Sequence, residues 1–197
     1  MIVKKIIDLC KKAGNITLYD NETGKIQWIS DGEAFYPLYG LPKFDESELY
    51  STFDISEKQQ KKIVFRHCED LPAAFDFSDY CAFERECVRK YLLVTGESEV
   101  APYHTTQGIK FILQKHLSPL SDAQQLSICE RKTAAGEIYF AVKAGFILLA
   151  LIMPHDALNE TYVEQLRNFA NECDRAFEKK RSGSYTEAGS LFEVNEK

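Results

Sequence analysis

The feature that most constrains the fold of this chain is a plan of elements that occurs twice. Residues 4–42 contain an amphipathic helical segment, a polar link and three β-rich runs, the last of which stops at a proline, and residues 111–154 repeat that order. An offset of 112 residues, from Gly24 to Gly136, aligns further identical residues. These are Ile16 with Ile128, Ile26 with Ile138, and Pro42 with Pro154. Two such segments predict an α+β protein of two related units, each a helix plus an antiparallel sheet.

The first copy has clear local signals. Apolar residues recur at helical spacing over residues 2–13 and leave four lysines off the stripe, so the pattern predicts a helix. Gly14 and Asn15 form a natural helix stop. Three strands are predicted after it, over residues 16–19, 25–29 and 34–38.

The second copy and the segment between the copies are less regular. The second copy predicts a short buried helix over 108–117 and strands over 126–132, 137–142 and 146–153. Before it, a short helical turn is expected at 46–50, and Ser56 with Gln59 forms a capping-box pattern that predicts a helix over about 57–68. Residues 70–80 are expected to be a loop, residues 82–94 fit a helix or a strand, and the polar stretch 96–107 predicts a mobile loop.

The C-terminal part has its own character. Residues 161–180 carry an apolar stripe with mixed charges on the other side, which predicts a long helix. We therefore expect four regions: a first unit over 1–55, a second over 56–156, a C-terminal helix over 157–181 and a disordered tail over 182–197.

Composition narrows the protein class. The longest apolar run, residues 144–154, is about half of the roughly 20 residues that span a bilayer, so no membrane partner is expected. The N-terminus lacks the pattern of a secretory signal, which predicts a cytoplasmic protein. The six cysteines show no C-x-x-C pair and are expected to be reduced and mostly buried.

Charge is unevenly distributed along the chain. The net charge is −6, but residues 1–13 carry four lysines against one aspartate, and residues 56–67 carry three lysines and one arginine against one glutamate. Each segment is therefore +3, and the remainder is −12. An acidic body with two basic segments would repel polyanions generally and accept one along a particular surface.

A helix, a hairpin and a last strand ending in Leu-Pro or Met-Pro resemble the repeated domains of the bacterial DNA polymerase sliding clamp, the polymerase III beta subunit. The matching segments are short: residues 6–10 in the helix, 35–38 with 41–42 at one domain end, and 149–154 at another. The chain is shorter than a three-domain clamp and continues past Met153-Pro154 into a long helix. A clamp-derived module that does not encircle DNA fits the resemblance as well as a ring built from several copies.

The resemblance implies a DNA clamp-like fold and a non-enzymatic, DNA-associated accessory or docking role. Clamp helices present cations to the duplex backbone, a role that would fall to Lys4, Lys5, Lys11, Lys12, Lys58, Lys61, Lys62 and Arg66. The family also docks partner peptides beside its final Met-Pro, which would place Met153 and Pro154 near an apolar pocket. Leu191 and Phe192 in the tail resemble the end of a clamp-binding peptide. Replication-type proteins would be the partners, with homo-oligomers as a further option.

Two alternatives remain open. One is an intracellular protein-protein interaction module with the same fold and no nucleic-acid role. The other is a small enzyme with a site near residues 96–108, for which a Cys–His pair would have to be assembled by the fold. No histidine spacing typical of a metal site and no phosphate-binding glycine loop occurs, so no catalytic residue, metal or cofactor is predicted.

Overall fold

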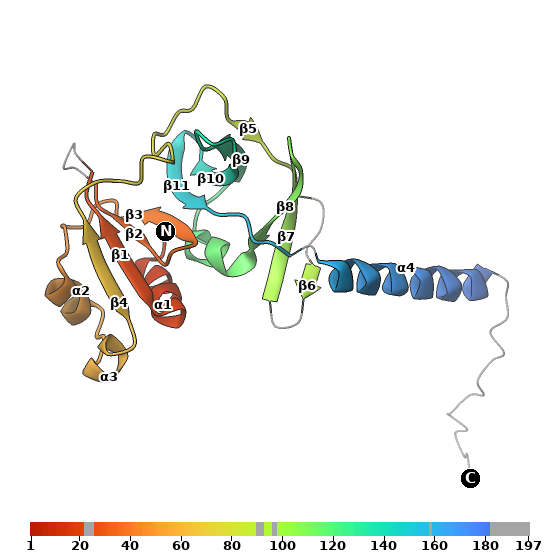
Figure 1. Ribbon diagram of the computed structural model, residues 1–197, viewed down its shortest axis with the longest axis horizontal. Coiled ribbons are helices and arrows are strands. Elements are labelled where there is room, and N and C mark those ends of the chain that lie inside the picture. The colour runs from red at the N-terminus through yellow and green to blue at the C-terminus, as the bar shows by residue number, and fades with distance from the viewer. Residues whose placement is uncertain (22–25, 90–92, 96–97, 158, 182–197) are drawn as a thin grey trace, which may run out of the picture. The chain divides into compact units, whose positions relative to one another are not determined.

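The computed structural model describes residues 1–21, 26–89, 93–95, 98–157 and 159–181. The chain divides into two compact units, Met1–His155 and Asp156–Lys197, so residues 1–55 and 56–155 belong to the same unit. The protein is mixed α+β, and its first unit contains an eight-stranded sheet and a three-stranded sheet (Figure 1). The predicted tail over 182–197 lies outside the described residues.

The first helix, α1 (Val3–Ala13), forms where the apolar stripe predicted it. Ile6, Ile7 and Cys10 are its buried residues, and they recur at the 3–4 residue spacing that brings side chains onto one helix face. The helix ends at Gly14, which adopts the left-handed conformation with φ 68° and donates its N–H to carbonyls of the last turn. Glycine adopts this conformation without the steric cost that a Cβ brings.

Gly14 also lies against a neighbouring segment, and this predicts a stability difference. A Cβ at Gly14 would lie 3.2 Å from the Lys62 carbonyl oxygen, whereas a Cβ at Gly40, with φ 73°, meets nothing within 4 Å. We expect Gly14→Ala to lower the free energy of unfolding by about 2 kcal/mol and the control Gly40→Ala by about 1 kcal/mol, because both carry backbone strain and only the first meets a carbonyl. Urea unfolding measures both, and equal losses would show that the contact contributes nothing.

After α1 the chain forms the predicted antiparallel meander of β1 (Asn15–Tyr19), β2 (Trp28–Ser30) and β3 (Ala34–Pro37). Strand β2 begins later than the predicted run over 25–29, of which residue 25 lies outside the described residues. Two helices follow, α2 (Glu46–Thr52), with a capping box at Asp45 and Glu48, and the short α3 (Glu57–Gln60). The helix predicted over 57–68 is wrong beyond residue 60. Residues Val64–Cys68 form strand β4, which pairs in parallel with the free edge of β1, because tertiary pairing overrides local helix signals.

The second half of the unit also differs from its prediction. Residues 96–107 were expected to be a mobile loop and 108–117 a helix. Instead, β7 (Ser98–Thr105) and β8 (Gly108–Leu113) form a hairpin, and only Gln114–Leu120 is helical, as the 3-10 helix η1. Strand β6 (Leu93–Thr95) joins β7 to complete the small sheet, and β5 (Arg85–Glu86) lies earlier in the segment that was ambiguous.

The three strands of the second copy form as predicted. They are β9 (Leu126–Lys132), β10 (Ile138–Ala144) and β11 (Ile147–Ile152), an antiparallel meander with β5 at its outer edge. Strand β11 pairs antiparallel with β3, and this pairing joins the two meanders. The order of the large sheet is therefore β4-β1-β2-β3-β11-β10-β9-β5.

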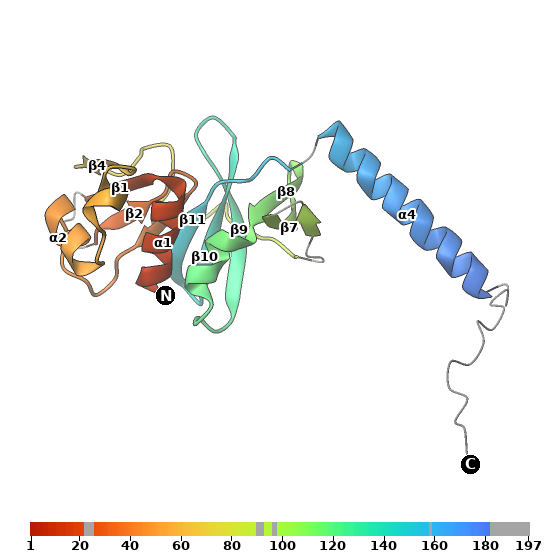
Figure 2. The same cartoon turned by 90° about the horizontal axis from the view of Figure 1, so that it is seen from below.

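The large sheet has an apolar layer on each face. On one face α1 covers the sheet (Figures 1 and 2) and packs together with η1, where the Ile2 N–H donates to the Pro119 carbonyl at 2.7 Å. A core of aliphatic and aromatic side chains fills this side of the sheet. On the other face Trp28, Phe35 and Tyr139 lie under an irregular segment, residues 69–84. The loop predicted over 70–80 is confirmed, and it covers this second face.

The second unit contains α4 (Glu160–Arg181), which confirms the predicted C-terminal helix. Asn159 begins it, and its side-chain oxygen accepts the N–H of Tyr162 at 2.8 Å, as an N-cap residue does. None of the residues of α4, all of which the structure describes, is buried. Among the helices in the described ranges, none has the length and apolar character needed to cross a membrane.

Candidate functional site

The two lysine-bearing segments found in the sequence meet at one corner of the first unit. The Val64 N–H donates to the Gly14 carbonyl at 2.9 Å, so the end of α1 adjoins the turn after α3. Of the seven lysines on these two segments, five lie toward the ends that meet, and we call them the basic corner: Lys11, Lys12, Lys58, Lys61 and Lys62. All are exposed except Lys11, which is half-buried and pairs with Asp8 at 2.9 Å. With Asp8 and Glu57 on the same segments, the corner has a net charge of +3.

The other three predicted phosphate contacts lie outside this corner. Lys4 is exposed on the first turn of α1, whereas Lys5 donates to the Ser118 carbonyl and the Ser121 hydroxyl and so links α1 to η1. Arg66 pairs across from Thr17. Since Ile16 and Leu18 face the α1 side of the sheet, Thr17 and Arg66 face the opposite side.

The predicted docking residues belong to the second face of the sheet. Met153 is half-buried against the aromatic layer, and its N–H donates to the Glu33 carbonyl at 2.8 Å. Pro154 is half-buried beside it in the chain. Leu191 and Phe192 lie outside the described residues.

Residues 69–84, which we call the strap, are held to the sheet by aromatic contacts. Phe77 contacts Trp28 edge to face with ring centroids 4.9 Å apart, and Phe75 contacts Tyr139 in the same way at 5.1 Å. The Tyr139 hydroxyl accepts the Asp76 N–H at 2.9 Å. Buried aromatic pairs of this geometry stabilise the folded state by more than the burial of their apolar area contributes. The strap is therefore a fixed layer of the fold.

A buried ion cluster fastens the end of the strap. Arg131, whose side chain is fully buried on β9, donates to Glu84 from Nε and Nη2, and its Nη1 donates to the carbonyls of Asp76 and Ser78. Lys143 on β10 donates to the other Glu84 oxygen at 2.6 Å. Burial raises the pKa of Glu84, but the hydrogen bonds and charges of Lys143 and Arg131 outweigh it, so the pKa lies below its usual range. The cluster therefore closes the strap onto the sheet.

A second buried polar group joins the β2–β3 turn to η1. Asp31 accepts the N–H groups of Glu33 and Ala34 through Oδ1, and its Oδ2 lies 3.1 Å from His116 Nε2. The Asp31 and His116 side chains are both 1% exposed. Glu33 Oε2 also approaches His116 Nε2, at 3.4 Å, and pairs with Lys115 at 3.0 Å on the exposed side. No local sequence pattern indicates this group, because Asp31 and His116 are 85 residues apart and belong to no motif.

This group has the residue types of a metal site, and its geometry argues for a structural role. One oxygen or nitrogen from each of Asp31, Glu33 and His116 lies within 4.8 Å of the others. Metal-binding histidines donate their second ring N–H to a fixed partner, but His116 Nδ1 is buried and, within the described part of the chain, has no hydrogen-bond partner. Donation from Nε2 to Asp31 leaves Nδ1 without a hydrogen-bond partner among the described residues. We therefore interpret Asp31 and His116 as a structural hydrogen-bonded pair.

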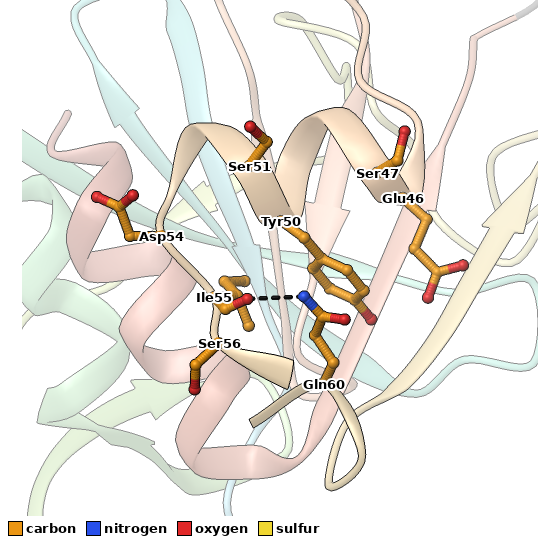
Figure 3. Close-up of a pocket in the computed structure, with 8 residues that line it drawn as sticks. All are labelled: Glu46, Ser47, Tyr50, Ser51, Asp54, Ile55, Ser56 and Gln60. Carbon is orange, nitrogen blue, oxygen red and sulfur yellow. Dashed lines mark hydrogen bonds between the residues drawn. The ribbon is translucent and has the colours of Figure 1, made fainter. Parts of the chain in front are cut away.

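A surface hollow beside the basic corner has the opposite electrostatic character. Figure 3 shows its lining residues, which come from α2, from the segment after it and from α3. Its volume is about 750 Å³. Glu46 and Asp54 are among the lining residues, and Gln60, also in the lining, donates to the Ile55 carbonyl at 2.7 Å (Figure 3). Burial, with a hydrogen bond to Glu46, raises the pKa of Tyr50 to about 12. An acidic lining of this kind disfavours phosphate.

The region proposed for an enzyme site is largely a hairpin. The Thr105 hydroxyl donates to the Gly108 carbonyl at 2.7 Å, and His104 is exposed. Tyr103 lines a second hollow of about 390 Å³, together with Cys87 and Arg89. Burial, followed by the charge of Glu130, raises the pKa of Cys87. A raised thiol pKa disfavours the thiolate that nucleophilic catalysis requires.

Comparison of the chain with protein-family models, with curated proteins and with solved structures gives no match.

Proposed function

We propose that this protein is a non-catalytic accessory factor that binds duplex DNA through the basic corner, without reading base sequence. The observation that carries the proposal is the meeting of two cationic segments, remote in sequence, at one exposed place on a chain of net charge −6. Lysines that contact phosphates supply salt-dependent affinity, and a negative remainder keeps DNA away from other surfaces.

The arrangement of the sheet supports a clamp-like version of this role. The two meanders have the same strand order, each follows a helical segment, and they join through β3 and β11. The proposed clamp-like contact differs from the expected one in its place. The lysines of the corner lie at the end of α1 and in and after α3, because the second basic segment is only partly helical. The lysine of η1, Lys115, pairs with Glu33 instead.

The proposal predicts a charge-reversal effect on DNA binding that depends on position. We expect Lys12→Glu/Lys61→Glu/Lys62→Glu to weaken binding to a labelled duplex at low salt by at least about tenfold. Losing about three phosphate contacts should reduce the slope of log K against log salt by about 3. Fluorescence anisotropy over a range of salt concentrations measures both quantities.

A second triple variant provides the matched control. Lys4→Glu/Arg66→Glu/Lys132→Glu changes the net charge by the same amount at three exposed residues outside the corner. It should retain most of the affinity and the salt slope. If both variants weaken binding equally, or if wild-type binding ignores salt, the corner is not a DNA site.

A further inference from the structure

Among the residues that the structure describes, helix α4 presents an apolar stripe in which no side chain is fully buried. It is 22 residues long, and Leu166, Phe169 and Phe177 are 38%, 66% and 61% exposed. Helices in water gain most of their stability by packing an amphipathic face, so a stripe of this length indicates a partner. This inference is independent of the proposed DNA role.

The spacing of the stripe identifies the partner as another helix. Val163, Ala170 and Phe177 are seven residues apart, and Leu166 and Cys173 lie three residues after the first two of them. Alternating spacings of three and four residues are the a and d positions of a heptad repeat, with Lys180 at the last d position. A seam this regular suits the side chains of a second helix better than the flat surface of a sheet.

We propose that α4 pairs antiparallel with the α4 helix of a second copy of this chain. In that orientation a positions face d positions, so Leu166 packs against the partner's Phe177, and Ala170 packs against the partner's Cys173. Each large side chain then meets another apolar one, and the two small side chains meet near the two-fold axis. At the ends of the seam, the Lys180 stem covers the partner's Val163 while its ammonium group reaches water.

Charge complementarity fixes the orientation. The e positions flanking the seam are Glu160, Arg167, Asp174 and Arg181, all exposed. In the antiparallel pair e faces e, so Glu160 meets the partner's Arg181, and Arg167 meets the partner's Asp174. All four contacts join opposite charges. In a parallel pair the e residues would face Tyr162, Phe169 and Ala176, and Lys180 would face its own copy. Exposed ion pairs add little affinity, but they select between orientations.

The test measures dimer dissociation of the full-length chain by sedimentation equilibrium, under reducing conditions. Arg167→Glu and Asp174→Arg each convert two attractive contacts into repulsive ones, so each should raise the dimer Kd by about tenfold. The double variant Arg167→Glu/Asp174→Arg restores opposite charges across the antiparallel pair and should return the Kd to within about threefold of wild type. Arg175→Glu, on the outer side of the helix, is the control and should leave the Kd unchanged.

Phe177→Asp tests the seam itself and should raise the Kd by at least about a hundredfold, with helicity checked by circular dichroism. A wild-type chain that stays monomeric overturns the proposal, which includes the case where α4 folds back onto its own chain. A dimer that is insensitive to Phe177→Asp places the interface elsewhere. Single charge variants that weaken the dimer without rescue in the double variant overturn the antiparallel orientation.

Discussion

Glu84→Gln is expected to lower the free energy of unfolding by about 3 kcal/mol, although it removes no atom from the core. The substitution keeps the size of the side chain and removes its negative charge. Arg131 and Lys143, both buried, would then face a neutral amide. Breaking one partner out of a buried ion cluster is costly because the remaining charges stay desolvated without compensation.

The matched control is Glu86→Gln, two residues along the chain on β5, where the side chain is exposed. It should change the free energy of unfolding by less than about 0.5 kcal/mol. Urea unfolding at neutral pH compares the two. A loss below about 1 kcal/mol for Glu84→Gln would show that water or rearrangement compensates the two cations.

A second variant distinguishes the cost of the unpaired buried charges from the loss of packing in the strap. Replacing the whole cluster with apolar residues, as Glu84→Leu/Arg131→Met/Lys143→Met, should recover much of the stability that Glu84→Gln loses, because no buried charge remains. The carbonyls of Asp76 and Ser78 lose their donor in this variant, so recovery should be incomplete. Amide hydrogen exchange at Asp76 would report whether the strap opens locally.

The contribution of Glu84 to the free energy of unfolding falls as the pH is lowered. Since the folded-state pKa of Glu84 is lowered, its contribution to stability is present above its unfolded pKa of about 4.3 and is lost as the pH falls through the folded value. Wild-type protein should therefore lose stability in acid more steeply than the Glu84→Gln variant over that range.

Local sequence patterns predicted the secondary structure correctly where residues close in the chain determine the backbone conformation. Helix α1 follows from its stripe and from Gly14, and the two meanders follow from β-rich runs between turn residues. The capping box at Ser56 also predicted the start of α3 correctly. It could not predict where that helix ends, because residues 64–68 are recruited by the open edge of β1, which local patterns do not report.

The helix predicted over residues 108–117 was wrong for a related reason. Their apolar residues fit a helical stripe, but the partner strand β7 lies in a segment too polar to predict as a strand. The sequence indicated the two cationic segments of the basic corner but not that they meet. Their meeting depends on the hydrogen bond between the Val64 N–H and the Gly14 carbonyl. Arg66 was assigned to the same helix face and instead belongs to a strand that turns it to the other side of the sheet.

The sequence did not indicate which residues pair in the buried polar contacts. Arg131 reaches Glu84 across 47 residues, and His116 reaches Asp31 across 85. A charged residue within a β-rich run, such as Arg131 or Lys143, was the available hint, because an ionised side chain on a central strand needs a partner. Which partner it finds is decided by the tertiary fold.

Asp31→Ala is expected to lower the free energy of unfolding by about 3–5 kcal/mol, the largest loss among the substitutions considered. The change removes the acceptor of the Glu33 and Ala34 N–H groups, and it leaves His116 Nε2 with only the more distant Glu33 Oε2, at 3.4 Å. Burial raises the pKa of Asp31, but its bonds to His116 and to the two backbone N–H groups outweigh that and lower it. Its contribution is therefore present above an unfolded pKa of about 3.9 and is lost as the pH falls through the folded value.

Two milder variants distinguish this account from a simple loss of volume. Asp31→Asn can still accept both backbone N–H groups, but its amide also donates, so His116 Nε2 must become an acceptor and Nδ1 must carry a proton with no partner. We expect a cost of about 1–3 kcal/mol. His116→Gln keeps a donor toward Asp31 without the unpartnered ring nitrogen, so it should cost less than Asp31→Asn.

The tautomer of His116 gives a direct check that does not depend on stability. Nitrogen NMR of the wild-type protein should show the proton on Nε2, because that atom lies 3.1 Å from the Asp31 carboxylate. A proton on Nδ1, or a cost below about 1 kcal/mol for Asp31→Ala, would contradict the structural pair. A rise in thermal stability on addition of Zn²⁺ that is lost in Asp31→Asn would instead identify Asp31, Glu33 and His116 as metal ligands, because an ion that binds only the folded state stabilises it.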